Sequence, residues 1–230
     1  MQTITSRLGT VRTRLDQACQ QAGRPVADVQ LLAVSKTQPA DAVRAAHAAG
    51  QCAFGENYVQ EALDKIAALA DLRAQLSWHL IGPLQSNKTR VVAEAFDWVH
   101  SIDRLKVAER LAEQRPAHLP PLNVCLQVNI SAEASKSGVA AADVAALARA
   151  VDALPRLRLR GLMAIPEPAA DLAAQRIPHR ALRELFEQLR ASGLSRLDTL
   201  SMGMSADLEA AVQEGATVVR VGTAVFGGRA

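Results

Sequence analysis

The chain begins with apolar residues spaced as on one face of a helix. This spacing is seen at Ile4, Leu8, Val11, Leu15 and Ala18, and Gly23 and Pro25 follow. Side chains three or four positions apart share one side of a helix, and glycine followed by proline favours its end. We therefore expect a leading amphipathic helix that packs with one face against the rest of the protein.

After this helix, short apolar runs alternate with longer segments of helical periodicity. Eight runs have the length and composition of strands: Val29 to Ser35, Cys52 to Gly55, Trp78 to Ile81, Trp98 to Ile102, Val124 to Ile130, Leu157 to Ile165, Leu200 to Met202, and Val218 to Phe226. Nearly continuous apolar runs are typical of parallel strands that are covered on both faces. The segments between them carry apolar stripes at helical spacing.

Eight such units predict an α/β fold, a single (β/α)8 TIM barrel with an extra N-terminal helix. A doubly wound open sheet is the alternative, but eight units in 230 residues favour closure. Because no low-complexity linker divides the chain, we expect one domain over residues 1–230. Long loops are expected from Ser131 to Gly138 and from Pro166 to Pro178, where small residues and prolines are concentrated.

The composition argues against several classes of partner and compartment. The 26 basic and 23 acidic residues give a formal charge of +3 and are interspersed, which does not indicate binding to nucleic acid or to a membrane surface. The three cysteines lie far apart without a CxxC pair, which suits neither a disulfide framework nor a zinc site. Arginines interrupt the apolar residues of the N-terminus, so we expect a mature cytoplasmic chain without a signal peptide or a membrane span.

The carboxyl ends of the predicted strands carry mostly polar residues and glycines. Barrel enzymes place their chemistry on this face. The residues of interest at these ends are Lys36, Asn57, His79, Ser201, Arg220, Gly222 and Thr223. The last two units contain glycine turns, as in the phosphate sites of many barrels. In such a phosphate site, Ser201, Gly222 and Thr223 would be the hydrogen-bond donors.

A phosphate anchor and a lysine at the same barrel mouth indicate a phosphorylated ligand with a carbonyl group. Lysine attacks a carbonyl only as the neutral amine, and its ordinary pKa is about 10.4. Burial of Lys36 or a nearby cation such as Arg220 would lower that pKa. The residues alone leave alternatives: Lys36 as a solvated charge at a loop, and Arg220 as a salt-bridge partner. Asp198 and Glu214 are the acids considered for that salt bridge.

A series of motifs from about residue 4 to residue 229 resembles one protein family. The motifs are "LLAVSKTQP", "FGENYVQEALDKI", "WHLIGPLQSNK", "VHSID", "LQVNIS", "SKSGV", "GLMAI", "LSMGMSADLEAAV" and "RVGTAVFG". On these motifs the chain is identified as a member of the YggS/PROSC group, the pyridoxal 5′-phosphate (PLP) homeostasis proteins. The fold of that group is similar to the N-terminal barrel of alanine racemase.

The resemblance implies that Lys36 carries PLP as an internal aldimine. It implies a set of cofactor-binding residues: Lys36, Asn57, His79, Ser201, Arg220, Gly222 and Thr223. Ser201, Gly222 and Thr223 would hold the phosphate, and Arg220 would face the pyridine nitrogen. Because arginine only donates, that nitrogen stays unprotonated and the ring is a weaker electron sink. Two alternatives stay open: His79 as a buried core histidine, and Asn57 as a helix cap.

Some residues depart from the racemase and family patterns. Alanine racemase uses a tyrosine base from a second domain, whereas this sequence ends after the eighth strand and its only tyrosine is Tyr58. A missing proton-transfer group costs about a hundredfold to ten-thousandfold in rate, so we expect little or no racemase turnover. Many family members have a second lysine where this chain has Gln38. Lys136 is a candidate for a transient second contact with the cofactor.

The sequence therefore predicts a carrier of PLP rather than an enzyme. We expect a cytoplasmic monomer that takes part in vitamin B6 and in amino-acid or keto-acid balance, with PLP-dependent apo-enzymes as recipients, and no catalytic residue or metal site. One alternative is a PLP-dependent amino-acid racemase, against which the absent second base argues. The other is a Schiff-base aldolase that uses Lys36 without PLP, against which Arg220 beside the glycine loop argues.

Overall fold

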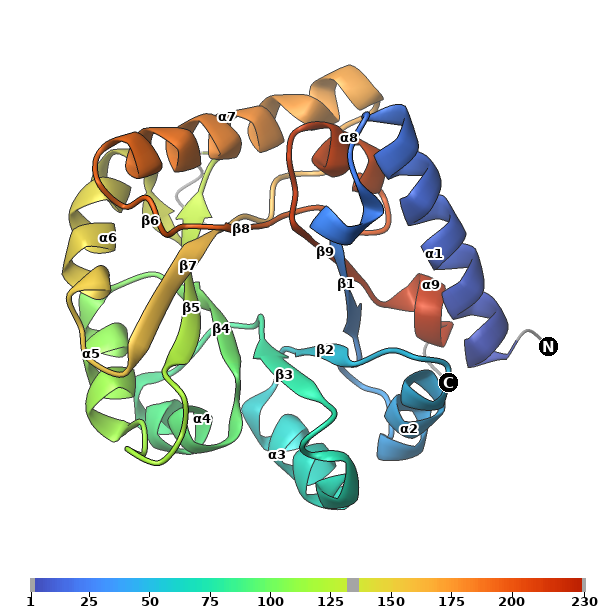
Figure 1. The fold of residues 1–230 in the computed structure, drawn as a ribbon, viewed down its shortest axis with the longest axis horizontal. Coiled ribbons are helices and arrows are strands. Elements are labelled where there is room, and N and C mark those ends of the chain that lie inside the picture. Colours follow the sequence, from blue (N-terminus) through green and yellow to red (C-terminus); the bar gives the residue numbers. More distant parts are fainter. Residues whose placement is uncertain (1–2, 132–136, 229–230) are drawn as a thin grey trace.

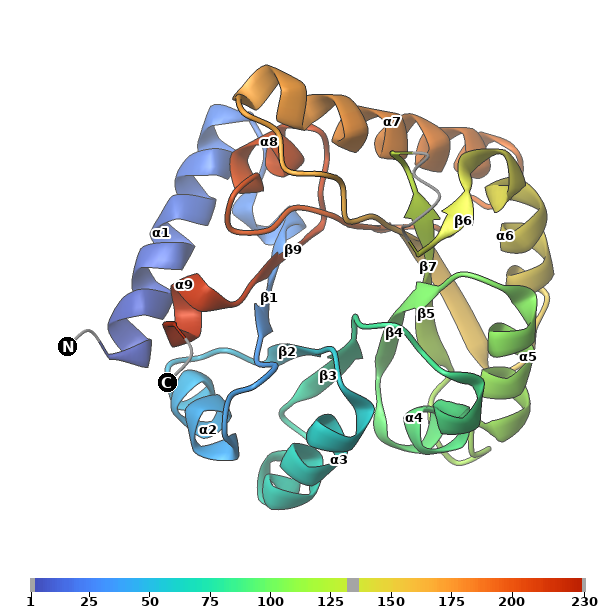
Figure 2. The same ribbon diagram turned by 180° about the vertical axis from the view of Figure 1, so that it is seen from behind.

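Eight parallel strands form a closed barrel in the computed structural model, which describes residues 3–131 and 137–228 (Figures 1 and 2). The barrel strands are β1 (Gln30–Val34), β2 (Ala53–Glu56), β3 (Ser77–Leu80), β4 (Trp98–Ile102), β5 (Leu122–Asn129), β7 (Leu157–Met163), β8 (Thr199–Ser201) and β9 (Val218–Val221). They follow the order β4-β3-β2-β1-β9-β8-β7-β5, and a further pairing of β4 with β5 closes the ring. The predicted barrel is confirmed, and the open-sheet alternative was wrong.

Helices surround the strands on the outside of the ring (Figure 1). The α-helices of the described ranges are α1 (Ile4–Gln21), α2 (Ala40–Ala48), α3 (Val59–Ala68), α4 (Thr89–Ala95), α5 (Leu105–Gln114), α6 (Val144–Asp152), α7 (Leu172–Ala191), α8 (Leu208–Gln213) and α9 (Thr223–Phe226). The two-residue strand β6 (Val139–Ala140) pairs with the end of β5. Within the described part of the chain, no helix combines the length and the apolar character that crossing a membrane requires.

The predicted leading helix is α1, and it covers the side of the barrel where the chain ends (Figures 1 and 2). It packs against both α8 and α9. Arg14 donates to the backbone carbonyl of Ser205 and pairs with Glu209, and Arg7 donates to the carbonyls of Val225 and Phe226. The helix therefore braces the two segments that follow β8 and β9. It covers a face that the four-residue α9 is too short to cover by itself.

The last predicted strand was wrong in its second half. β9 ends at Val221, and residues from Thr223 form the short helix α9 rather than continuing the strand. Val225 and Phe226 are buried, as the apolar run predicted, but they belong to a helix that packs beneath α1 and not to a strand. A short apolar run does not by itself distinguish a strand from one buried helical turn.

The loop predicted from Pro166 to Pro178 was also wrong in its second half. Helix α7 starts at Leu172, where the carboxylate of Asp171 accepts a hydrogen bond from the backbone N–H of Ala174 at 2.9 Å. Pro178 lies inside this helix. A proline there removes one helical hydrogen bond, but the buried face of the helix starts directly after it, at His179. Tertiary packing therefore stabilises the helix after the proline, while the Asp171 cap stabilises its first turn.

Candidate functional site

Lys36 and Asn57 follow neighbouring strands at the mouth of the barrel. In the pairing of β1 with β2, Val34 lies opposite Gly55. Two residues further along both parallel chains are Lys36 and Asn57. The first two strands therefore carry an amine and an amide just beyond their adjacent carboxyl ends.

The other neighbour of β1 brings the end of the chain to the same lysine. Lys36, Gly222 and Thr223 line one small cavity of about 100 Å³. Lys36 is half-buried there, whereas Thr223 is exposed. The approach is close, because a Cβ atom on Gly222 would lie 3.2 Å from the carbonyl oxygen of Val34. The structure thus brings together the predicted covalent lysine and two of the three predicted phosphate residues.

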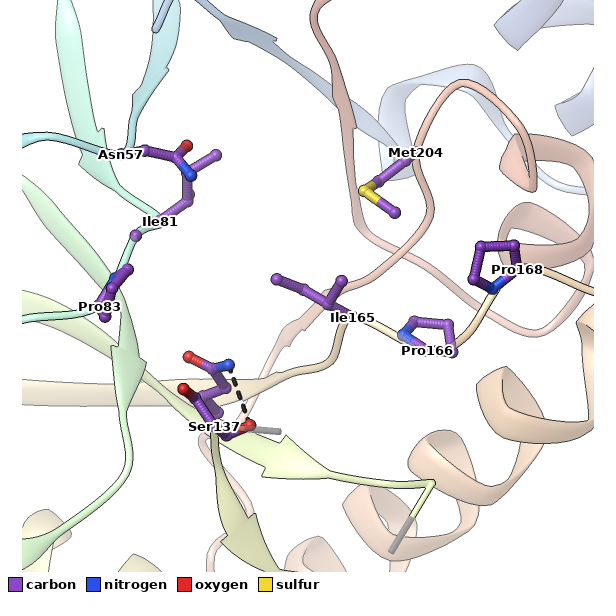
Figure 3. Close-up of a pocket in the computed structure, with 10 residues that line it drawn as sticks. Asn57, Ile81, Pro83, Ser137, Ile165, Pro166, Pro168 and Met204 are labelled. Atoms are coloured by element: carbon purple, nitrogen blue, oxygen red, sulfur yellow. Dashed lines mark hydrogen bonds between the residues drawn. The ribbon is translucent and has the colours of Figure 1, made fainter. Parts of the chain in front are cut away.

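A larger cavity of about 520 Å³ opens over the centre of the barrel mouth. Figure 3 shows Asn57, Ile81 and Pro83 on one side of it and Ile165, Pro166, Pro168 and Met204 on the other. Its lining is largely apolar. The side-chain oxygen Oδ1 of Asn57 is buried and has no hydrogen-bond partner among the described residues. This cavity therefore combines apolar walls with an unpaired polar atom, as ligand sites commonly do.

Asn57 is held in place by a very close backbone contact. Gly82, in the segment after β3, lies against it, and a Cβ atom at position 82 would be only 2.2 Å from the carbonyl oxygen of Asn57. Only glycine permits two backbones to approach this closely. The wall of the larger cavity therefore depends on a glycine at this position.

Arg220 is buried in the barrel interior and held by three hydrogen bonds. Its guanidinium donates to the carbonyl oxygen of Ser201 at 2.6 Å, to the hydroxyl of Ser201 at 2.8 Å and to the carbonyl oxygen of Ala164 at 2.8 Å. It is 4% exposed, and burial lowers its pKa to about 10. The guanidinium is thus still charged at neutral pH, and its orientation is set by β7 and β8.

A chain of hydrogen bonds continues from Ser201 through two buried histidines. The Ser201 hydroxyl lies 2.8 Å from Nδ1 of His100, and Nε2 of His100 lies 2.9 Å from Nδ1 of His79. Nε2 of His79 in turn lies 3.0 Å from the hydroxyl of Ser77. Because a guanidinium only donates, the Ser201 oxygen accepts from Arg220 and its own hydrogen is available to His100. Each neutral histidine then donates from Nε2, His100 to His79 and His79 to Ser77. The series of hydrogen bonds therefore reaches Ser77 at the opposite end of the barrel.

Burial keeps both histidines neutral. It lowers the pKa of His79 to about 3, and His79 also stacks on Trp98 with ring centroids 5.3 Å apart. The pKa of His100 is well below its ordinary value, first because of burial and then because a protonated His100 would be repelled by its neighbours His79 and Arg220. A neutral imidazole has one donor and one acceptor nitrogen. Each histidine needs both to link its two neighbours in this series of hydrogen bonds.

These two histidines should make the fold sensitive to acid. Their pKa values are lower in the folded state than in the unfolded state, so the unfolded state binds more protons below about pH 6.5. Their contribution to stability is therefore complete above that pH and is lost as the pH falls, by up to about 1.4 kcal/mol per pH unit for each histidine. We expect H100N to show a shallower fall in the free energy of unfolding between pH 6.5 and 4.5 than the wild type. Urea unfolding at several pH values measures this.

The control for that measurement is H118N, because His118 is exposed. The wild-type pH dependence should be retained in H118N. Equal slopes in the wild type and in H100N would contradict the assignment of His100 as a buried neutral group.

Several predicted site residues lie deeper than the sequence suggested. Both ring nitrogens of His79 and the hydroxyl of Ser201 have partners inside the barrel, so a direct contact of either with a ligand would require one of those bonds to break. The structure agrees with the alternative that His79 is a satisfied core histidine. The salt-bridge alternative for Arg220 was wrong, because Asp198 pairs with Arg160 and Glu214 with arginines of α7.

Sequence reasoning missed three buried residues near the site, namely Glu56, Lys65 and His100. Glu56 and His100 interrupt apolar strands, and a polar side chain in a buried strand was the signal available in the sequence. Lys136 lies outside the described residues. Among the residues that the structure describes, no cluster of histidine, cysteine, aspartate or glutamate side chains is arranged to hold a metal ion.

The chain is similar to known proteins over its whole length. Residues 7–230 match a family described as "Alanine racemase, N-terminal domain". A "Pyridoxal phosphate homeostasis protein" of Pseudomonas aeruginosa is 65% identical over 229 residues, which cover 100% of this chain and 97% of that protein. A protein of the same name from Escherichia coli K12 is 54% identical over 230 residues, with 100% and 98% covered.

Solved structures with the same fold include a PLP-bound protein. PipY of Synechococcus elongatus PCC7942 with PLP bound has a TM-score of 0.85 and 41% identity, and the match covers 98% of this chain and 100% of that one. Alanine racemase from Corynebacterium glutamicum has a TM-score of 0.71 at 19% identity. The match with the racemase covers 94% of this chain but 59% of the racemase, and it shows a common fold only.

Proposed function

Because this chain belongs to the family of pyridoxal phosphate homeostasis proteins, which has the fold of the alanine racemase N-terminal domain, we propose that it holds PLP covalently on Lys36. The barrel as one domain would form the binding unit. The observation that carries this proposal is the single cavity shared by Lys36, Gly222 and Thr223.

The shape and chemistry of the barrel mouth fit a phosphorylated pyridine. The small cavity at Lys36 would receive the phosphate end near Gly222 and Thr223, and the larger apolar cavity would receive the ring. The unpaired Oδ1 of Asn57 supports a polar contact with the ligand on that side. PLP supplies an aldehyde that condenses reversibly with amines.

Lys36 would form the covalent link, and the other residues would position the ligand. Lys36 would supply the amine Nζ for this condensation, in which the two amine hydrogens would leave with the aldehyde oxygen as water. Arg220 would face the pyridine nitrogen as a donor, with the Ser201–His100–His79 chain fixing its orientation. In this arrangement Ser201 and His79 act through Arg220. A direct contact of either with PLP stays a prediction.

We propose a carrier of PLP rather than an enzyme. The only tyrosine of the sequence, Tyr58, is 56% exposed, and its place at the start of α3 does not support a role as a second base. The cavity at Lys36 would sequester a reactive aldehyde until a PLP-dependent apo-enzyme receives it. We further propose that the protein acts as a monomer in the cytoplasm, where the three cysteines, free in the described structure, would stay reduced.

The test is to mix the purified protein with PLP, record its absorption spectrum, reduce it with borohydride and map the modified residue by mass spectrometry. We expect a yellow protein with one phosphopyridoxyl group on Lys36. A protein that stays colourless and unlabelled would overturn the proposal. A racemisation assay on several amino acids completes the test, since turnover comparable to that of ordinary PLP enzymes would contradict the carrier role.

A further inference from the structure

A buried charged cluster lies behind the segment that carries Lys36. We call Ser35, Glu56, Glu61 and Lys65 the Lys65 cluster. Its members come from three neighbouring elements: the residue after β1, the last residue of β2, and helix α3. Glu56 is 0% exposed and Lys65 is 5% exposed, so two oppositely charged side chains are almost completely removed from solvent. A charge is buried in this way only when it is paired and hydrogen-bonded.

The ammonium group of Lys65 makes three hydrogen bonds. Nζ donates to the backbone carbonyl of Ser35 at 2.6 Å, to Oε1 of Glu56 at 2.8 Å and to Oε1 of Glu61 at 2.6 Å. An ammonium has three donors, so all of them are used. The hydroxyl of Ser35 also donates to Oε1 of Glu56 at 2.6 Å. Lys65 therefore joins the end of β1 to β2 and α3.

The same cluster holds the residue on the other side of Lys36. The backbone N–H of Thr37 donates to Oε1 of Glu61, the oxygen that also accepts from Lys65. Thr37 has a φ of 63°, in the left-handed region that β-branched residues rarely adopt. Such a conformation persists only when surrounding contacts determine it. The peptide groups before and after Lys36 are thus both held by a network centred on Lys65.

The charges of the cluster make Lys65 its central member. Burial raises the pKa of Glu56, and its hydrogen bonds from Lys65 and Ser35 offset part of that rise. Without the ammonium, Glu56 would lose its buried cation, and Ser35 and Glu61 would each lose a partner at the same time. None of the three charged residues of the cluster lines the cavity at Lys36 or the larger cavity at the mouth. Any effect of the cluster on a ligand must therefore pass through neighbouring residues that do line these cavities, namely Lys36, Thr37 and Asn57.

We propose that Lys65 is a positioning residue for Lys36, which it serves by fixing the backbone on both sides of that lysine. The proposal rests on the proposed covalent holding of PLP. A lysine side chain has four rotatable bonds, and a fixed backbone limits where its amine can lie. Small displacements of a reacting group can lower a rate by a hundredfold. Lys65 thereby sets how fast the amine of Lys36 reaches the aldehyde carbon.

The experiment compares covalent and non-covalent binding in K65M, a variant with an unbranched side chain of similar length and no charge. The rate of covalent linkage with PLP is measured from absorbance and confirmed by borohydride labelling. Affinity for pyridoxine 5′-phosphate, which lacks the aldehyde, is measured separately by calorimetry. We expect the linkage rate to fall roughly ten- to a hundredfold, while the affinity for pyridoxine 5′-phosphate stays within about twofold, because the cavity residues themselves are unchanged.

Variants of Glu61 keep the test informative if K65M does not fold. E61A removes the acceptor of the Thr37 N–H and should slow the linkage as K65M does, whereas E61Q keeps an amide oxygen there and should stay near the wild-type rate. The matched stability control is R115M. Arg115 is also buried and donates to three backbone carbonyls, but it lies among residues of the opposite end of the barrel. R115M should lose stability without a change in the linkage rate.

Each result bears on a separate claim. Linkage rates in K65M and E61A within twofold of the wild type would overturn the role of Lys65 and leave the proposed function standing. An equal loss of pyridoxine 5′-phosphate binding would also overturn it, since the cavity as a whole would then have changed. Failure of the wild-type protein to form an adduct on Lys36 would instead refute the proposed function.

Discussion

Replacement of Lys36 by methionine is expected to abolish covalent retention of PLP while the barrel stays folded. The covalent bond requires the amine of Lys36, and a thioether offers no substitute. Lys36 is only half-buried and makes no hydrogen bond or ion pair with the described residues. The free energy of unfolding should therefore change by no more than about 0.5 kcal/mol. Borohydride labelling and gel filtration with PLP measure the retention, and urea unfolding measures the stability.

Two further variants sharpen this result. K36R keeps a positive charge but has no reactive amine, so it should lose the covalent adduct and keep weak, reversible binding. K88M removes an exposed lysine from the segment after β3 and should retain full labelling. Undiminished labelling of K36M at neutral pH would show that another lysine carries the cofactor.

Replacement of Arg220 by methionine is expected to weaken both the fold and the binding of PLP. The variant loses a buried guanidinium with three hydrogen bonds, and it leaves the carbonyl of Ala164 without that donor. Hydrogen bonds from charged groups contribute about 1.5–3 kcal/mol each. Because the variant no longer buries a charge, part of the loss of these three bonds is offset, and we expect a net loss of roughly 3 kcal/mol in the free energy of unfolding. The pyridine nitrogen would also lose its proposed donor. The affinity for PLP should fall by roughly tenfold or more, with a shift in the absorption band of the bound form.

R115M separates these two effects of R220M. Arg115 is also 4% exposed and also makes three hydrogen bonds, to the carbonyl groups of Ala93, Phe96 and Pro120. It should lose comparable stability and keep the affinity and spectrum of the wild type. If R220M retained wild-type affinity and spectrum, Arg220 would be a structural residue without a role at the pyridine ring.

The sequence was sufficient to predict the barrel and the family. Parallel strands buried on both faces need apolar residues throughout, and this requirement is visible locally in runs such as those around Trp98 and Val124. The family prediction rested on motifs in order along the chain, and the curated relatives confirm it. The predicted ends of strands and loops were less accurate, because the local pattern did not show how these segments pack in the folded protein. Val225 and Phe226 are apolar because they pack as a helix under α1. Helix α7 includes Pro178 because Asp171 caps its first turn and a buried face follows the proline.

By itself, the sequence determined which residues stand at the ends of the strands. Lys36, Asn57, Gly222 and Thr223 each lie within two residues after a strand, and the carboxyl ends of parallel barrel strands meet on one face. Their convergence could therefore be predicted without coordinates.

Only the tertiary structure decided which side chains support that face from below. His100 and Ser201 are 101 positions apart, and Lys65 is 30 positions from the carbonyl of Ser35. Such contacts depend on which strands are neighbours, on their register and on how far a side chain reaches into the interior, and no local pattern encodes these quantities. The physical reason is that strand propensity and apolar periodicity are properties of short segments. The orientation of Arg220 and the backbone around Lys36 are instead set by hydrogen bonds between residues distant in the chain.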